Sequence, residues 1–186
     1  MRAAKIDQNG IEVALNLDGS GNAEIKTGEG FLDHMLTSFA KHGIFDLRLK
    51  VLEEIEKRDV AEKAGEALGS AFKKALGDKK SIRRFGYAII PMDESLATIA
   101  VDISGRGYLS FNAEFTCTAI ASFEVEEVER FLYAFVHSAG ITLNVKAEGE
   151  NNHHKIEAIF KALGIALSEA ARKDERRGIP STKGVL

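Results

Sequence analysis

The residues with the clearest chemical potential are two adjacent histidines and a glutamate, in a segment with helical periodicity. His153 and Glu157 lie four positions apart, so on a helix they share one face and can converge on one ion. His154 points about 100° away and would serve a second ion or a neighbouring subunit. Imidazole with carboxylate suits divalent manganese, iron or zinc, and a bare surface pair of histidines is the competing interpretation.

A third histidine and two carboxylates are further candidates. His34 lies near the start of another apolar helix, where it is either a ligand or a satisfied histidine of the core. Asp93 and Glu94 follow a predicted strand, and their carboxylates either support a ligand or cap an element.

Several side chains spread along the chain could hold an anion, namely Arg84, Arg106, Lys161, Ser181 and Lys183. Lys161 lies one turn after Glu157 and therefore on the same helix face. The stretch around Lys183 adds hydroxyl groups and a flexible glycine, which suits a phosphate or a carboxylate. Each residue alone also fits a solvated surface charge, and sequence spacing does not show that the set converges.

Periodicity predicts an order of strands, helix, strand and helix that occurs twice. The first round comprises two strands within the first thirty residues, a helix at 30–42, a strand at 45–51 and a helix at 55–76. The second comprises strands at 87–115 with breaks at Pro91 and 104–107, a helix at 125–138, a strand at 141–146 and a helix at 152–172. An irregular tail is expected from residue 178.

The repeat is also visible at single residues. Asp59-x-x-Glu62 is matched by His154-x-x-Glu157 at a constant offset of 95, and an Ala-Leu-Gly triplet follows each at the same distance. Both helices carry Ala and Gly on one stripe, which favours close packing, most simply against the partner helix.

The predicted fold class is α+β, a duplicated unit of β-sheet plus helix with the sheets backed by packed helices. The two halves are residues 1–92 and 93–186, which together form one compact unit. Of 186 residues, 45% are hydrophobic and 28% are charged, which is ordinary for a folded domain.

Composition also limits the partners. The net charge of -3 argues against nucleic acid or an acidic membrane surface as a general partner. The one cysteine, Cys117, excludes an intrachain disulfide. The N-terminus lacks the apolar stretch of a signal peptide, and no run approaches the roughly 18 apolar residues of a membrane span. We therefore expect a cytoplasmic protein.

Seven motifs together resemble the imidazoleglycerol-phosphate dehydratases of histidine biosynthesis, from about Arg2 to Leu186. They are Gly30–Leu36, Ala40–Gly43, Arg84–Gly86, Pro91–Glu94, Ser104–Arg106, His153–Ala162 and Pro180–Leu186. The resemblance implies two similar βαβ-type halves with a ribosomal protein S5 domain 2-like fold. It also implies a homotrimer, which metal ions join into 24-subunit shells.

The same resemblance implies a lyase that dehydrates imidazole glycerol phosphate to imidazole acetol phosphate with two manganese ions per chain. The ions would hold the substrate imidazole as imidazolate while a base removes a proton from the glycerol side chain. The implied metal ligands are His34, Glu62, His153, His154 and Glu157. The implied phosphate-binding residues are Arg84, Arg106, Lys161, Ser181 and Lys183.

The first half departs from the family motif His-x-Asp-x-His-His-Thr-x-Glu-Asp. Arg58 and Asp59 stand where the two adjacent histidines are expected, and only Glu62 of that ligand set remains. Asn144 replaces a strand histidine, and Gln8 stands at the place of the catalytic glutamate. An amide is a poor ligand for a transition metal and cannot act as a general base at neutral pH.

These replacements predict weakened metal binding and impaired dehydration. Two alternatives stay open. One is a working dehydratase that recruits other ligands, such as Asp59 with Glu62. The other is a non-catalytic or engineered scaffold that keeps the fold and its oligomer contacts. A third interpretation is a different metal-dependent hydrolase on the same frame. The content of tightly bound metal and the oligomeric mass separate the first two.

Overall fold

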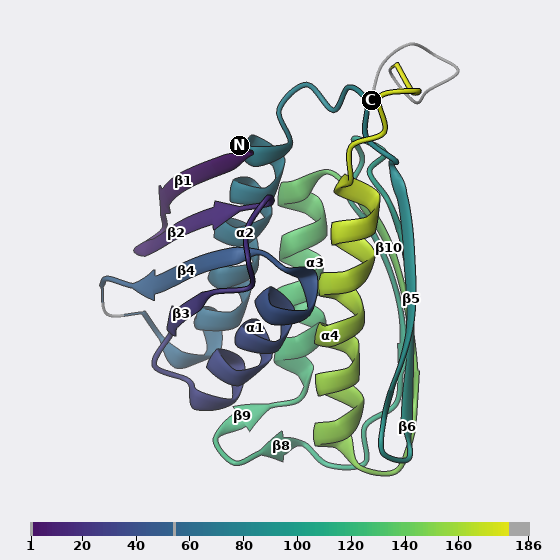
Figure 1. The fold of residues 1–186 in the computed structure, drawn as a ribbon. Coiled ribbons are helices and arrows are strands. Elements are labelled where there is room, and N and C mark those ends of the chain that lie inside the picture. Colours follow the sequence, from purple (N-terminus) through teal and green to yellow (C-terminus); the bar gives the residue numbers. More distant parts are fainter. Residues whose placement is uncertain (1, 54, 179–186) are drawn as a thin grey trace.

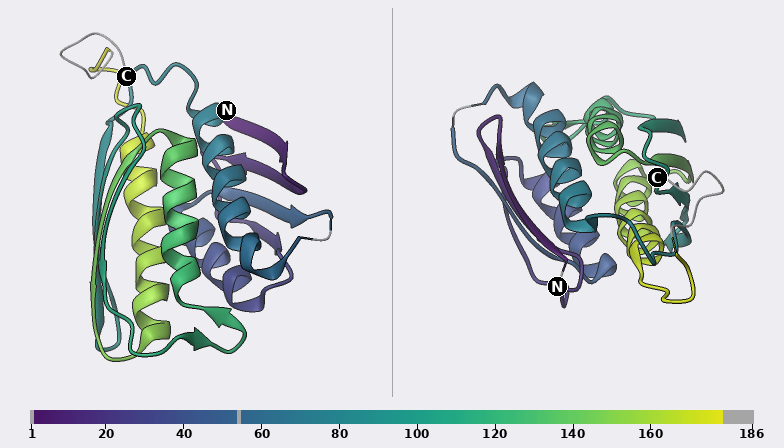
Figure 2. Two further views of the ribbon diagram at one scale, coloured as in Figure 1. Left: turned by 180° about the vertical axis from the view of Figure 1, so that it is seen from behind. Right: turned by 90° about the horizontal axis from the view of Figure 1, so that it is seen from above.

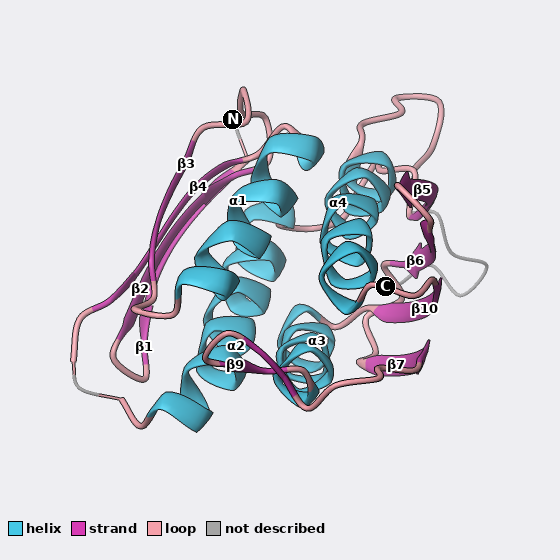
Figure 3. Ribbon diagram, turned by 90° about the horizontal axis from the view of Figure 1, so that it is seen from below, coloured by secondary structure: helices cyan, strands magenta, loops and turns pink. Residues whose placement is uncertain are grey.

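The chain folds as two sheet-and-helix halves that meet through their helices. The computed structural model describes residues 2–53 and 55–178. Its layers follow the order sheet, helices, helices, sheet (Figures 1 and 3). Seen from behind and from above, the helices lie between the two sheets (Figure 2). A cluster of buried hydrophobic side chains continues from one half into the other.

The two halves repeat the same order of elements. The first contains β1 (Ala3–Gln8), β2 (Ile11–Asn16), β3 (Ala23–Lys26), α1 (Gly30–Gly43), β4 (Asp46–Val51) and α2 (Lys57–Leu76). The second contains β5 (Phe85–Met92), β6 (Ser95–Asp102), β7 (Tyr108–Ala113), α3 (Glu126–Ala139), β10 (Thr142–Glu148) and α4 (Asn152–Ala171). The short hairpin of β8 (Ala119–Ile120) and β9 (Phe123–Glu124) precedes α3.

The sheets share one topology. Their strand orders are β1-β2-β4-β3 and β5-β6-β10-β7. β3 runs parallel to β4, and β7 runs parallel to β10, whereas the other neighbouring strands are antiparallel. The parallel pairs are joined through α1 and α3, as a crossover between parallel strands requires. The duplicated α+β fold that the sequence predicts is thus confirmed.

Local sequence explains why these elements form. Ile11, Val13 and Leu15 of β2 are buried while the residues between them are partly exposed, which is the period-two pattern of a strand with one covered face. α3 ends at Gly140, whose φ of 67° suits glycine and closes the last turn. In the described part of the chain, no helix is both long enough and apolar enough to cross a membrane.

Three details differ from the sequence-based expectation. The first thirty residues hold a third strand, β3, which is too short for a clear periodicity. β5 continues through Pro91, because an edge strand has one side that makes no ladder hydrogen bonds. Since β5 belongs to the second sheet, the division between the sheets lies between Leu76 and Phe85, before the predicted boundary at residue 92. The predicted irregular tail lies outside the described residues from 179 onward.

The helix layers contact each other as crossed pairs. α1 packs against α4, and α2 packs against α3, so each long helix meets the short helix of the other half. A Cβ on Gly164 would lie 2.3 Å from the carbonyl oxygen of Phe39, and one on Gly69 would lie 2.5 Å from that of Phe135. The Ala and Gly stripes therefore do permit close packing, but against the short helices and not against each other.

A cluster of charged side chains joins the halves where α1, α2 and α3 begin, and two of its members, Glu29 and Glu127, are buried. Glu29 accepts hydrogen bonds from the Ser122 hydroxyl at 2.9 and 3.1 Å, and Lys57 Nζ lies 3.0 Å from the same carboxylate. Glu127, in the first turn of α3, is only 3% exposed. Burial raises the pKa of Glu127, and the negative charges of Glu124 and Glu29 raise it further.

We expect Gly164→Ala to lower the free energy of unfolding by about 1–3 kcal/mol, because the added methyl group meets backbone that cannot move without opening the contact between α1 and α4. Urea unfolding measures the change. Gly30→Ala is the matched control, since a Cβ at that helical position has no neighbour within 4 Å. Alanine also has a higher helix propensity than glycine, so this substitution should not destabilise the protein. Equal stability of wild type and Gly164→Ala would contradict the close contact.

We expect Glu127→Gln to gain stability relative to wild type as the pH rises from 4 to 7. The folded protein keeps the Glu127 proton at a pH where the unfolded chain has already lost it, above about 4.3. The wild-type free energy of unfolding therefore falls as the pH rises toward the raised pKa, and the amide removes that contribution.

Urea unfolding at several pH values measures the difference between the two proteins. The exposed neighbour Glu126 provides the control, because Glu126→Gln removes a charge from the same helix turn without removing a buried one. A stability difference between Glu127→Gln and wild type that does not change with pH would contradict the buried, proton-retaining carboxyl.

Candidate functional site

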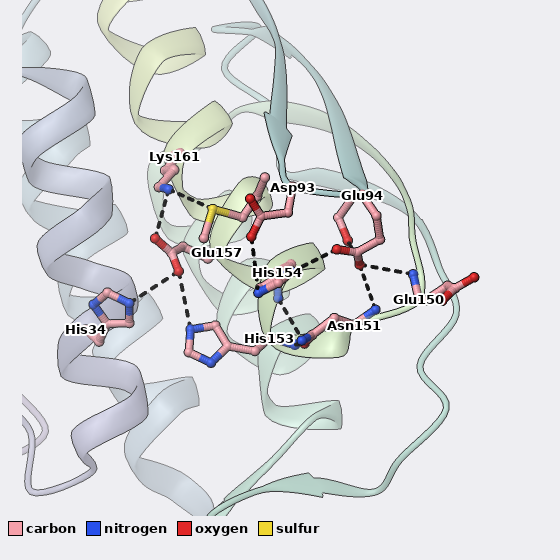
Figure 4. A network of polar contacts seen from close by, with 11 residues as sticks. His34, Asp93, Glu94, Glu150, Asn151, His153, His154, Glu157 and Lys161 are labelled. Atoms are coloured by element: carbon pink, nitrogen blue, oxygen red, sulfur yellow. Dashed lines mark hydrogen bonds and ion pairs between the residues drawn. The ribbon is translucent and has the colours of Figure 1, made fainter.

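The crossed helix pair α1 and α4 brings three of the predicted ligands together. His34 lies on α1, while His153 and Glu157 lie one turn apart on α4 (Figure 4). Asn151 caps α4, since its side-chain oxygen accepts hydrogen bonds from the backbone N–H groups of His153 at 2.9 Å and His154 at 3.4 Å. The first-half histidine thus meets the second-half ligands across the junction of the halves.

The geometry of these three side chains fits a metal ion. Glu157 Oε2 lies 3.4 Å from His34 Nε2 and 3.3 Å from His153 Nε2, and the three ligand atoms all lie within 4.8 Å of one another. Ligands bound at about 2.1 Å around one ion are themselves separated by about 3.0–3.4 Å. Within the described part of the chain, this is the one cluster of at least three such residues. Two imidazoles and a carboxylate fit manganese, iron or zinc.

Lys161 and Phe31 hold two of these ligands in place. Lys161 Nζ lies 2.8 Å from Glu157 Oε1 and 3.3 Å from the sulfur of Met92. Burial alone would raise the pKa of Glu157, but the hydrogen bond and charge of Lys161 and the proximity of His34 hold it below its usual range. The Phe31 ring meets the His153 ring edge-on at 5.2 Å between centroids. The carboxylate is therefore charged and its second oxygen faces the imidazoles.

His154 leaves α4 in a direction about 100° from that of His153, as the helical geometry predicts. Its Nδ1 lies 2.8 Å from Glu94 Oε2, and its Nε2 lies 3.7 Å from Asp93 Oδ2 (Figure 4). The hydrogen bond to Glu94 is the largest reason why the pKa of His154 is raised. His154 therefore does not join the three-ligand cluster.

The equivalent place in the first half contains different side chains. α1 and α3 are both 14 residues long, and α2 and α4 are both 20 residues long, so Arg130 occupies the place of His34, and Arg58 that of His153. Glu62 matches Glu157 and lines a hollow beside Arg130. Arg58 pairs with a neighbouring acid, Glu56, at 2.8 Å. Among the described residues at these equivalent positions there is no imidazole.

The repeat offset of 95 does not by itself indicate Arg130, because Arg130 lies 96 positions after His34 and the short helices are one residue out of step with the long ones. Asp59, in the first turn of α2, lines a small hollow with Glu62 and Asn9, where the β1–β2 turn approaches α2. Gln8 ends β1 immediately before that turn. In the described chain, Asp59 and Glu62 do not form a three-residue metal cluster.

Asn144, which stands at the place of the strand histidine, lies outside the three-ligand cluster. Asn144 is an exposed residue of β10, while Leu143 and Val145 beside it are buried. Its side chain therefore lies on the sheet face that points away from the helices.

The predicted phosphate-binding residues do not all converge within one chain. Arg84 Nε donates to Asp102 at 2.7 Å, and its guanidinium lies 4.8 Å from the centre of the Phe85 ring. The backbone N–H of Arg84 binds the carbonyl of Ala170, which is 13 residues beyond Glu157 and thus about 20 Å along α4. Arg106 lies in the loop between β6 and β7. Ser181 and Lys183 lie outside the described residues.

Comparisons with known proteins give the same answer as the motifs. Residues 27–167 match the family model described as imidazoleglycerol-phosphate dehydratase. The imidazoleglycerol-phosphate dehydratase of Methanocella arvoryzae is 54% identical over 192 aligned positions, which cover 100% of both chains. That of Acetivibrio thermocellus is 52% identical over 98% of this chain and 95% of its own.

Solved structures agree at the level of the fold. Imidazoleglycerol-phosphate dehydratase from Staphylococcus aureus subsp. aureus N315 gives a TM-score of 0.85 at 39% identity, over 92% of this chain and 98% of that one. The Pyrococcus furiosus structure, in complex with (S)-C348, gives 0.83 at 35% identity, over 98% and 100%. From its motifs, its repeated fold and these relatives, the chain belongs to the imidazoleglycerol-phosphate dehydratase family.

Proposed function

We propose that this chain is a dehydratase of imidazole glycerol phosphate, a lyase of histidine biosynthesis, whose catalysis is strongly impaired. One observation supports the impairment above all others. The described chain gathers two imidazoles and a carboxylate in the second-half site only, whereas the equivalent first-half place holds two arginines and Glu62. One chain would therefore supply a three-ligand centre for one ion, and only His154 with the neighbouring Asp93 for a second.

The residues of the cluster have separable roles in this proposal. A divalent cation there would polarise a bound imidazole and stabilise negative charge on it. His34 and His153 would supply nitrogen ligands, and Glu157 would supply the negative charge, which Lys161 keeps in place. Gln8 has no basic group, so it cannot accept the proton that the reaction must remove. The ring and phosphate of the substrate could still bind while proton transfer is slow.

The positions of Arg84 and Asn144 support a site that is shared between copies of the chain. Arg84 lies about 20 Å along α4 from Glu157, and Asn144 points away from the helices. If these positions serve one substrate together with Lys161, they come from different copies of the chain. The proposal therefore includes a homo-oligomer, as the family resemblance implies.

The outer face of the second sheet is the surface that would contact another copy. It exposes five large apolar side chains, namely Phe85 (55%), Tyr87 (74%), Ile89 (59%), Leu96 (44%) and Tyr108 (62%). Strand alternation and register place them on the face opposite the helices. An exposed apolar patch of this kind is typical of a protein interface.

Metal content and turnover test the proposed function together. In protein purified with manganese, we expect at most one tightly bound ion per chain, and we expect His153→Ala to lose it. Turnover of imidazole glycerol phosphate should lie at least about 100-fold below that of the Methanocella arvoryzae relative, because a general base alone contributes about 10²–10⁴ in rate. Mass spectrometry counts the metal, and the appearance of the dehydrated product gives the rate.

His137→Ala is the matched control, since His137 lies on α3 with its Nδ1 2.8 Å from the Tyr133 carbonyl oxygen, outside the cluster. Restoring Gln8→Glu, Arg58→His and Asp59→His together should raise both metal content and turnover. Two ions per chain with full turnover in the unmodified protein would instead support other ligands, such as Asp59 with Glu62. Absence of both metal and turnover would support a non-catalytic scaffold.

We expect Tyr87→Lys to dissociate the oligomer, because the substitution places a charge in the row of exposed apolar side chains on β5. Light scattering after size exclusion should give a trimer, or a larger assembly of trimers, for wild type and a smaller mass for the variant. Lys50→Glu, on the exposed side of β4, is the control and should keep the wild-type mass. A monomeric wild type, or a variant of unchanged mass, would rule out this contact.

A further inference from the structure

A carboxylate outside the three-ligand cluster binds His154 from the β5–β6 turn. Glu94 Oε2 lies 2.8 Å from His154 Nδ1 (Figure 4). Its other oxygen, Oε1, accepts hydrogen bonds from the backbone N–H groups of Asn151 at 2.8 Å and Glu150 at 3.2 Å, and from the Ser95 hydroxyl at 2.8 Å. The two oxygens thus have different partners, since one collects donors at the start of α4 and the other faces the imidazole.

These contacts decide where the hydrogen of the imidazole lies. Glu94 Oε1 accepts three hydrogen bonds, which favour the charged form of a side chain that is ionised at neutral pH even without partners, so the group is a carboxylate. A carboxylate has no hydrogen to donate, and the bond at Nδ1 therefore requires the imidazole to be the donor. In the neutral ring the lone pair is then on Nε2, which lies 3.7 Å from Asp93 Oδ2.

We propose that Glu94 is a positioning residue, which fixes neutral His154 as the Nδ1–H tautomer and presents its Nε2 lone pair to a divalent cation beside Asp93. Carboxylates commonly fix the ring of a metal-binding histidine in this way. The use of the lone pair rests on the proposed metal function, whereas the tautomer is a property of the protein without metal. The site is distinct from the cluster at Glu157, because Nε2 of His154 faces Asp93 and His154 is not among the three clustered ligands.

The variant Glu94→Gln distinguishes two roles of Glu94, namely fixing the tautomer of His154 and capping the start of α4. Three donors surround the place of Oε1, so the amide oxygen of the glutamine is expected there, and the cap of α4 is kept. The amide nitrogen then faces His154 and donates to Nδ1, which must carry the lone pair. The hydrogen of His154 moves to Nε2, where it blocks the nitrogen offered to a cation.

Nitrogen NMR of the histidine rings tests this in metal-free, ¹⁵N-labelled protein at about pH 9, well above the ordinary histidine pKa of about 6.5. A His154→Gln variant identifies the signals. We expect the Nδ1–H tautomer in wild type and in the control Asp93→Asn, and the Nε2–H tautomer in Glu94→Gln, with little change in its unfolding midpoint.

An Nε2–H tautomer of His154 in wild type would overturn the proposal, whatever the Glu94→Gln protein does. A folded Glu94→Gln protein that keeps the Nδ1–H tautomer would also overturn it, because Glu94 would then act only as a cap. Since no metal is present in the experiment, a failure of the three-ligand cluster to bind an ion would leave this result unchanged. The two proposals can therefore fail independently.

Discussion

The close contact between α1 and α4 is the constraint on which the candidate site depends. Gly164 lets the backbone of α4 approach the carbonyl of Phe39 on α1, and a side chain there would hold the helices apart. His34 is 123 positions from Glu157 in sequence, yet this contact brings their side chains within 3.4 Å. A shift of even 1 Å between the helices would separate ligands that must converge on one ion. The close packing of α1 on α4 therefore also sets the geometry of the candidate metal ligands.

The same packing occurs at the other crossed pair, where the chemistry is different. Gly69 meets the carbonyl of Phe135 as Gly164 meets that of Phe39. Arginines occupy the places of the two imidazoles, and a fixed positive charge repels a dication. Nearby, Lys57 pairs with the buried Glu29 and joins the start of α2 to the start of α1. The first half has therefore kept the backbone arrangement while its side chains form ion pairs suited to stability.

At the start of α4, helix capping and ligand placement use the same atoms. Asn151 accepts from the N–H groups of both histidines, and its own N–H is bound by Glu94 in the β5–β6 turn. The turn therefore fixes the first helical turn, and with it the directions of His153 and His154. This coupling explains why a carboxylate that looks like a simple cap in sequence also controls a histidine ring.

The sequence by itself determined the repeat, the order of the long elements and the helix face shared by His153, Glu157 and Lys161. It also determined that Arg58 stands opposite His153. These features are local or depend on a fixed offset, so periodicity and alignment of the halves reveal them. Only the tertiary structure decided whether His34 faces the core or the ligands.

The tertiary structure also decided that α1 packs on α4, that β5 joins the second sheet, and that Arg84 pairs with Asp102 far from Glu157. Both long helices carry the same Ala and Gly stripe, which fits either short helix equally well by pattern alone. The choice depends on how complete layers of side chains fill the space between the sheets, a property of the whole fold that no segment carries alone.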